Sequence, residues 1–399
     1  LQNEYEEYRT KAIEREQKVR RQLQDEINKQ AEASKNNMLW GKPANDILNG
    51  RDNSASANPI RAVWEMVQNA RDVSTNQSNI IFTRRKEVFE FKHDGIPFTN
   101  NTLNALILQT SAKSRNDGDQ VGQYGTGFLT THIFGREFEL AGSLQLVEEE
   151  ELYYNFPKLT IDRKPNTREK MIESLANQFK EKESWLEKDD YRSNKPNKWT
   201  IFTYFQPYDK ERQNVKIAFE QAIETIPYVL CLNENIKSIQ LHDEITDRSI
   251  SFNRKEKILK EKTSISYLYS TIILINDSRN EKSGEFSILT LESKKTVTTK
   301  KGINKTMVTV ILPIHNNIVG KLSDNISKLF IYLPLVGTEH WGINFVIHAP
   351  MFTCSSDDRS SLRLITDGLQ VYSRGIRYSF RLYQSASIRV ERCSLFGTN

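Results

Sequence analysis

The stretch WEMVQNARD, from Trp64 to Asp72, carries two carboxylates and an amide within an otherwise apolar helical pattern. Glu65, Asn69 and Asp72 are spaced i, i+4 and i+7, so a helix presents all three on one face. The opposite face is an apolar stripe expected to meet a core, made of Val63, Met66, Val67 and Ala70. Carboxylate and amide oxygens suit a hard cation such as Mg²⁺, which is usually shared with substrate phosphates. The trio therefore indicates either a metal and phosphate site, with Glu65 polarising an attacking water, or a solvated charged face.

A glycine cluster, VGQYGTGF at residues 121–128, provides a second candidate site. Gly122, Gly125 and Gly127 precede an apolar run that ends at Phe134. Glycines let backbone amides approach a ligand closely, and the N-terminus of the following helix favours negative charge. The order G-x-x-G-x-G differs from the dinucleotide fingerprint, and the chain has no G-x-x-x-x-G-K-[ST] motif. The cluster therefore predicts a phosphate cradle that is neither a Rossmann site nor a P-loop, or else a mobile loop before a helix.

Composition places the chain among globular proteins that remain in water. With 399 residues, 37% of them hydrophobic and 27% charged, the chain predicts two or three domains and excludes wholesale disorder. A formal charge of +5, diluted by 51 acidic residues, does not by itself indicate a nucleic-acid partner. Three widely separated cysteines suggest neither a disulfide framework nor a zinc site. No apolar window approaches the roughly 18 residues of a membrane span, so we expect a cytoplasmic protein without a membrane partner.

The pattern of elements divides the chain into three parts. Residues 1–37 predict a highly charged N-terminal helix or arm, either solvated or packed on a partner. Residues 38–205 predict a first domain with an exposed, charged and mainly helical insertion at about 148–198. Residues 206–399 predict a separate α+β domain. Its expected elements are a helix near 215–226 and strands at 236–241, 270–275, 296–300, 307–314, 329–335 and 344–350.

The first domain has clear local signals around its two candidate motifs. A helix is expected to begin at Pro59, because proline favours the first helical position. Strands are expected at 79–83 and 87–91, and the second leads into a turn, KHDGIPFT. The Asp-Gly pair and the proline of this turn are residues typical of loops. A binding or catalytic loop is expected there.

In chain order, the helix trio, the turn and the glycine cluster resemble the GHKL ATPase superfamily of gyrase, heat-shock protein 90, histidine kinase and MutL. EMVQNARD is similar to the first motif of that superfamily, and TSAKS at 110–114 followed by VGQYGTGF is similar to the lid and third motif of the chaperone branch. The likeness is closest to the heat-shock protein 90 and sacsin-like branch and covers about residues 38–205. It implies an α+β fold, in which a two-layer α/β sandwich ATP-binding (Bergerat) domain precedes a transducer-like domain.

The resemblance implies a role for each matching residue, with ATP and Mg²⁺ as the cofactors. Glu65 corresponds to the catalytic general base, Asn69 to the Mg²⁺ ligand, and Thr200 to the threonine that helps to fix adenine. Asp72 keeps the spacing of the chaperone branch. The residues implied in ATP binding are Asn69, Asp72, His93, Asp94, Gly95, Ser111, Lys113, Ser114, Gly122, Gln123, Tyr124, Gly125, Thr126, Gly127, Phe128 and Thr200.

The second motif departs from the superfamily pattern Asp-x-Gly-x-Gly, whose aspartate accepts a hydrogen bond from the adenine amino group. Aligned on Gly95 and Thr99, the chain has His93 at the aspartate position, Asp94 one residue later and Pro97 in place of the second glycine. Either Asp94 accepts the adenine bond, or a neutral His93 does so through its unprotonated ring nitrogen. A third interpretation makes His93 a residue that only caps the turn.

The resemblance implies a slow ATPase that works as a conformational switch. Binding of Mg-ATP closes a lid over residues 110–125, two chains associate, and hydrolysis resets them, with Arg359 of the second domain as a candidate γ-phosphate contact. The leading hypothesis is a chaperone-like or regulatory protein that acts on a client or partner subunit, in a bacterial stress or defence system.

Three rival functions share the same fold. A nucleic-acid-acting protein of the MutL or gyrase kind is favoured by the basic run KVRRQ at 18–22. A non-hydrolysing ATP-binding scaffold is favoured by the altered second motif. A histidine kinase is disfavoured, because the first histidine is His93 and no phosphoacceptor precedes the ATP motifs in the sequence.

Overall fold

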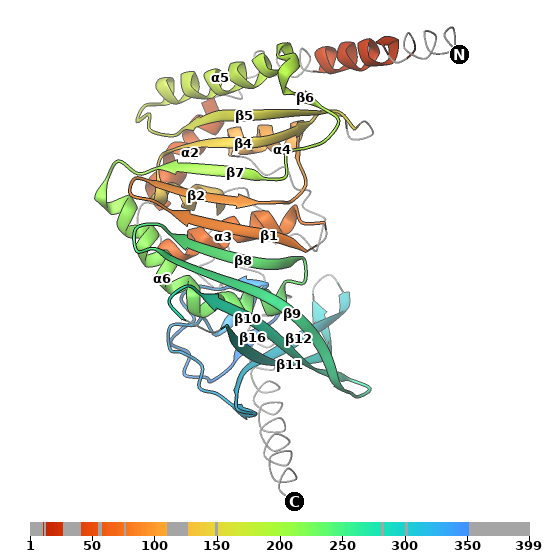
Figure 1. The fold of residues 1–399 in the computed structure, drawn as a ribbon, viewed down its shortest axis with the longest axis vertical. Coiled ribbons are helices and arrows are strands. Elements are labelled where there is room, and N and C mark those ends of the chain that lie inside the picture. Colours follow the sequence, from red (N-terminus) through yellow and green to blue (C-terminus); the bar gives the residue numbers. More distant parts are fainter. Residues whose placement is uncertain are drawn as a thin grey trace, which may run out of the picture.

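The protein has a mixed α+β fold built on one large sheet. The computed structural model describes residues 11, 13–26, 41–54, 58–75, 77–109, 127–147, 151–280, 283–299 and 302–350. Its helices are α2 (Gly41–Ser54), α3 (Pro59–Asp72), α4 (Asn100–Leu108), α5 (Arg168–Ser184), α6 (Asp209–Leu232) and the 3-10 helices η2 (Gly127–Phe134), η3 (Trp185–Glu187) and η4 (Asp189–Tyr191). In the view of Figure 1, α2, α3 and α6 lie behind the sheet and α5 lies along its upper edge.

The sheet runs through both halves of the chain. Its strands are β1 (Ser78–Arg84), β2 (Val88–His93), β3 (Phe98–Thr99), β4 (Glu137–Gln145), β5 (Tyr153–Asp162), β6 (Arg192–Ser193), β7 (Thr200–Phe205), β8 (Ile236–Asp243), β9 (Arg248–Lys262), β10 (Ser266–Asp277), β11 (Gly284–Thr299), β12 (Gly302–His315), β13 (Ile318–Val319), β14 (Leu329–Ile331), β15 (Leu333–Pro334) and β16 (Val346–His348). Their order is β15-β14-β16-β12-β11-β10-β9-β8-β1-β2-β7-β4-β5-β6, with β13 beside β12 and β3 beside β4.

Helix α3 begins at Pro59, as the sequence predicts. Asn58 is its N-cap and accepts a hydrogen bond from the backbone N–H of Ile60 at 3.2 Å, which satisfies one of the free donors of the first turn. The expected apolar stripe is buried, but so are Trp64 and Gln68 on other faces of the helix. The cause is that η2, α6 and β1 all pack against α3, so several sides of the helix are covered.

The sheet around β2 has one covered face, as its alternating sequence indicates. Burial alternates along β2, and Phe89 and Phe91 point toward the helix layer. Their neighbours on β4 and β7 are also aromatic, and the ring centroids of Phe138 and Tyr204 lie 4.9 Å apart. Phe89 also contacts Phe134 of η2, with ring centroids 4.9 Å apart. This aromatic layer fixes the sheet against η2 and α3.

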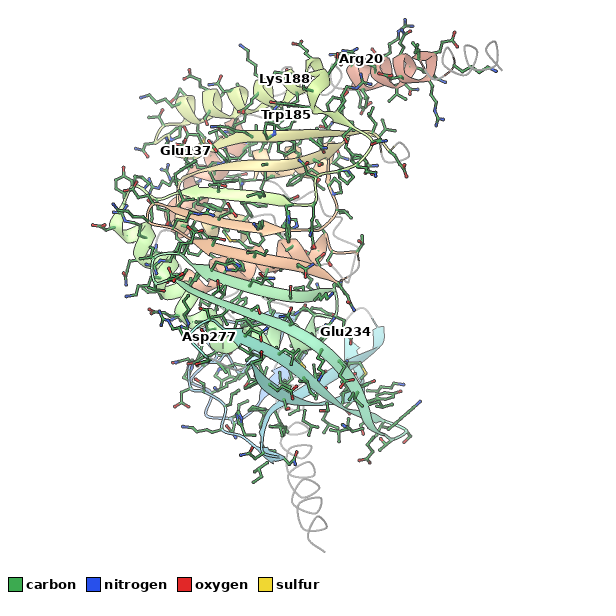
Figure 2. All side chains as sticks on the ribbon, viewed as in Figure 1. Arg20, Glu137, Trp185, Lys188, Glu234 and Asp277 are labelled. Atoms are coloured by element: carbon green, nitrogen blue, oxygen red, sulfur yellow. The ribbon has the colours of Figure 1, made fainter. Side chains whose placement is uncertain are left out.

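The charged segment 148–198 is not a mainly helical insertion that decorates the fold. Its first part forms β5, a ten-residue strand paired with β4, and only its second part is helical. Trp185, labelled in Figure 2, is buried and stacks on Phe156 of β5 with ring centroids 4.2 Å apart. The two exposed residues Pro157 and Lys158 interrupt the alternation of β5, which explains why its sequence does not look like a strand.

The second half of the chain continues the same sheet. Strand β8 follows α6 and pairs in parallel with β1, with Ile80 opposite Ile239. The expected strands of this half are present, and the sequence prediction misses β9 and the first part of β11. The division into domains at about residue 205 stays a prediction, since the described strands form one hydrogen-bonded sheet across it.

The described part of the N-terminal arm is helical at residues 13–26 and packs on the fold. Val19 and Leu23 are buried, so the helix is not solvated all round. Arg192 forms an ion pair with Glu16, and Arg20, labelled in Figure 2, lies 3.9 Å from Asp189. Over the described ranges, no helix combines the length and apolar character that crossing a bilayer requires.

Helices α4 and α5 are joined by a buried cation. Lys182 of α5 donates to the side-chain oxygens of Asn100 at 2.8 Å and Asn104 at 2.6 Å, both on α4. Burial lowers the pKa of Lys182 from its ordinary value of 10.5 to about 8. Desolvation of the charged ammonium therefore destabilises the folded state.

Lys182 should make stability depend on pH between about 8 and 10.5. In that window the unfolded chain binds the proton and the folded chain releases it, so the free energy of unfolding rises with pH by on the order of 3 kcal/mol. We expect the urea midpoint of the wild type to rise across this window and that of Lys182→Met to rise less. Lys188→Met, at an exposed lysine beyond α5, is the control and should follow the wild type. Parallel curves for all three proteins would contradict this account.

Candidate functional site

The sequence-predicted trio lies on the C-terminal half of α3, and its members differ in environment. Glu65 is only 6% exposed, and the side chain of Asp72 is also buried, so the expectation that the trio faces outward is wrong for both carboxylates. Asn69 is partly exposed. The Asp72 side chain is 4% exposed and forms an ion pair with the guanidinium of Arg71 at 3.4 Å. The buried carboxylate of Glu65 is thus followed, four residues later on the helix, by the partly exposed amide of Asn69.

The turn after β2 is pinned to the C-terminal end of α3. The backbone N–H of Ile96 donates to the carbonyl of Val73, the C-cap of α3, at 2.9 Å. Gly95 lies so close that a Cβ built on it would be 2.7 Å from Val73 Cγ2 and 2.8 Å from Val73 O. The C-terminal end of the helix that carries the trio and the turn at His93 to Ile96 are therefore parts of one structural unit.

His93 ends β2 on the inner face of the sheet, in register with Thr200 of β7. Both residues are buried. Burial lowers the pKa of His93 to about 4, so the ring is neutral at neutral pH. The backbone N–H of Gly95 donates to Nδ1 of this ring at 3.2 Å. That bond assigns the proton to Nε2, so the free nitrogen is a hydrogen-bond donor.

Asp94 belongs to a polar chain that crosses the sheet. Its Oδ1 accepts from the backbone N–H of Asn79 at 2.6 Å and its Oδ2 from the Asn79 amide at 2.7 Å. The amide oxygen of Asn79 in turn accepts from the hydroxyl of Ser238 on β8 at 2.7 Å. A carboxylate has about four acceptor positions, so Asp94 keeps capacity for a further donor. The acceptor nitrogen of His93 is already used by the Gly95 N–H, and both oxygens of Asp94 accept from Asn79, so the choice between the two residues for an adenine contact stays a prediction.

The glycine cluster is placed only at its C-terminal end. Gly127 and Phe128 open η2, which packs against α3. The element is a buried 3-10 helix, fixed by bonds from Thr131 Oγ1 to the Phe128 carbonyl at 2.7 Å and between Tyr204 and Thr131 at 3.0 Å. The remaining predicted residues lie outside the described ranges: Ser111, Lys113, Ser114, Gly122, Gln123, Tyr124, Gly125, Thr126 and Arg359.

The sequence analysis misses the residues that hold the base of this loop. Helix α4 ends at Gln109, whose φ of 53° is left-handed. The buried Arg163 at the end of β5 donates to the carbonyl of Ile107 in the last turn of α4, and to Gln178 of α5 at 3.2 Å. A cation at the C-terminus of a helix is favoured by the exposed carbonyls there. No sequence signal identifies Arg163, because its partners are backbone and amide oxygens distant in the chain.

The residues present suit a magnesium ion shared with phosphates better than a metal held by protein alone. Among the described residues, no group of three or more His, Cys, Asp or Glu side chains is placed to hold a metal. Mg²⁺ commonly takes one or two protein oxygens and completes its shell with water and phosphate. The accessible amide of Asn69, one turn from the Glu65 carboxylate, fits that requirement.

Comparisons with known proteins add no family to this description. No family model matches the chain, and no curated protein matches it significantly. The resemblance of the site therefore rests on its motifs and on the geometry described above.

Substituting Gly95 should loosen the attachment of the turn to α3. In Gly95→Ala the new methyl group would meet a backbone oxygen at 2.8 Å, and the turn must shift to relieve the overlap. We expect a loss of roughly 1–3 kcal/mol, as for other overpacked sites, measured as a lower urea midpoint. Gly284→Ala is the matched control, because the nearest atom to its Cβ is 3.9 Å away. Equal midpoints for the two variants would show that the contact at Gly95 is not close enough to matter.

Proposed function

We propose that this protein binds Mg-ATP and hydrolyses it slowly, as a conformational switch. The observation that supports the proposal is the meeting of three sequence-distant motifs: α3 with its carboxylate and amide, the turn at His93 to Ile96 fixed on its end, and η2 against its side. A phosphate chain bound by the loop before η2 would reach α3, and a base near β2 and β7 would reach the same turn. The proposed architecture is a two-layer ATP-binding sandwich at 38–205 followed by a transducer-like domain.

Recognition of the base is assigned to the inner end of β2 and β7. Either Asp94 would accept a hydrogen bond from the adenine amino group, or His93 would contact the base. His93 lies opposite Ile80 and Asp94 bonds to the adjacent Asn79, so the two side chains lie on different sides of the strand. Thr200 is in register with His93 and is the third polar group there. All three are held by the sheet before any ligand arrives, which lowers the ordering cost of binding.

The phosphates are assigned to α3 and the glycine loop. Asn69 would hold Mg²⁺, which supplies charge neutralisation for the phosphate oxygens when bound. Glu65 would accept a proton from the attacking water as its oxygen bonds to the γ-phosphorus, while the bond from that phosphorus to the bridging oxygen breaks and ADP leaves. The burial of Glu65 limits its contact with bulk solvent, and reliance on a single general base supports the proposal of slow turnover.

The switch itself would use the contacts of α3 with the second half of the chain. Helix α3 packs against α6 and β15 as well as η2. Movement of α3 on ATP binding would therefore change its contacts with α6 and β15, which lie outside the nucleotide site. Association of two chains and action on a client or partner protein belong to this proposal, as does a chaperone-like or regulatory role.

The role of Glu65 can be tested by removing its charge at nearly constant volume. Glu65→Gln should keep ATP affinity and lower turnover by about 10²- to 10⁴-fold, the usual contribution of a general base. Phosphate release measures the turnover, and calorimetry measures the affinity. Glu137→Gln, on β4 and paired with Lys164, is the control and should keep full turnover. Undiminished hydrolysis in Glu65→Gln would refute the role, and ATP binding without wild-type hydrolysis would favour the non-hydrolysing scaffold.

The role of Asn69 can be tested through the dependence of binding on magnesium. The wild type should bind ATP more tightly with Mg²⁺ than without it, and Asn69→Ala should show the same weak affinity in both conditions. Isothermal titration with and without Mg²⁺ makes the comparison. Asn276→Ala, an exposed asparagine on β10, is the control and should behave as the wild type. A magnesium effect that survives in Asn69→Ala would remove this residue from the metal site.

A further inference from the structure

The curled strands β9 to β12 border a cavity that also includes Arg71 of α3, which lies in the same helical turn as the predicted site residue Asn69. It has a volume of about 860 Å³ and lies between these strands, the C-terminal end of α6 and the segment around β14 to β16. Figure 1 shows β9 to β12 continuing past α6, and Figure 2 labels Glu234 at the α6 side of this region. Six lining residues carry the argument: Arg71, Asn233, Lys257, Lys294, Tyr332 and His348.

Two stacked tyrosines of β10 lie beside Lys257 and Lys294, two lysines that line this cavity. Tyr267 and Tyr269 are two residues apart, so they share one face of the strand, and their ring centroids are 6.3 Å apart with an interplanar angle of 20°. The ammonium of Lys257 lies 4.3 Å from the Tyr269 ring centre. Lys294 and Lys262 lie 5.1 Å and 5.7 Å from the Tyr267 ring centre. The result is a short ladder of aromatic faces bordered by three lysines.

The positive charge of this ladder is only partly balanced. Lys257 forms ion pairs with Glu234 and Glu292, both at 2.9 Å. Within the described ranges, neither Lys262 nor Lys294 has a carboxylate oxygen at ion-pair distance. The ammonium groups of both lysines contact the Tyr267 ring. The end of the ladder at Tyr267 therefore carries two lysines beside an aromatic ring, and Glu292, the partner of Lys257, lies opposite Tyr267 on β11.

The opposite wall of the cavity is held in a fixed and strained conformation. Tyr332 has a φ of 62°, which is unfavourable for a bulky residue. Its carbonyl accepts from the Asn233 amide at 2.8 Å, and its ring lies 4.8 Å from that of His348. The guanidinium of Arg71 lies 4.0 Å from the same ring centre. Aromatic faces and cations thus border the cavity on two sides.

We propose that this face of β9 to β12 binds single-stranded nucleic acid. Unpaired bases offer flat surfaces that stack on tyrosines, and the phosphates between them offer regularly spaced anions for lysines. A duplex keeps its bases inside the stack, so it would leave the tyrosine faces unused. An acidic peptide would satisfy the lysines and leave the same faces unused. The proposal rests on the ladder and does not depend on the proposed ATPase.

The test is fluorescence anisotropy of the full chain with a labelled oligothymidylate of about 20 nucleotides, in the absence of ATP. We expect Tyr267→Ala to weaken binding about tenfold, because one base loses its stacking partner, and Tyr267→Phe to retain it. Lys262→Glu/Lys294→Glu should lower the slope of log affinity against log salt by about 1.4, the loss of two phosphate contacts on a single strand. An oligouridylate of the same length tells whether RNA binds as well as DNA.

A charge-matched control separates this site from general attraction. Lys188→Glu/Lys195→Glu makes the same change in net charge at exposed lysines beside η4 and β6, at the other end of the sheet. It should keep the wild-type affinity and salt slope. The proposal would be overturned if the two double variants lost affinity equally or if the wild type did not bind. It would also be overturned if a duplex bound more tightly, or if a mononucleotide alone displaced the oligonucleotide.

Discussion

The packing of α3 is the constraint on which the rest of the candidate site depends. The C-cap carbonyl of Val73 accepts the Ile96 N–H, and Gly95 leaves no space between turn and helix. These contacts fix the residues before the turn relative to α3, while η2 fixes the end of the glycine loop relative to the same helix. Three segments separated in sequence are thereby held together through α3. Such preorganisation is what a site needs in order to bind a flexible polyanion.

Local patterns predict the elements well and their surroundings poorly. Pro59 and the periodic residues after it are sufficient to predict α3, because capping and hydrophobic spacing are local. The burial of Glu65 could not be predicted, since helical periodicity does not say how many neighbours cover a helix. Strand β9 is missed because its second part, RKEKILKEK, lacks an alternating pattern, and five of those nine residues are exposed. The parallel pairing of β8 with β1 joins residues more than 150 positions apart, which no local signal encodes.

The same contrast applies to the site. The spacing of Glu65, Asn69 and Asp72 and the Asp-Gly turn are readable as chemistry from residue types alone, and the structure brings the turn onto the end of that helix. The bond from Asn79 to Asp94 has no counterpart in the sequence, because an asparagine at the start of a strand is unremarkable until its partner is known. Which of two adjacent residues can accept a hydrogen bond depends on those partners. The turn sequence therefore left open a question that only the tertiary contacts address.

Two polar links connect the candidate site to the second half of the chain. One runs from Asp94 through Asn79 to Ser238 on β8, and the other places Arg71 of α3 over Tyr332 at the cavity wall. If ATP repositions α3, the Arg71 contact changes with it, because Arg71 lies within the same helical turn as Asn69. Any free energy by which ATP alters binding in the cavity must equal the free energy by which the cavity ligand alters ATP binding. The strained Tyr332 is the element that would carry this coupling, since contacts of that wall hold its left-handed backbone, among them the Asn233 bond and the Arg71 stack.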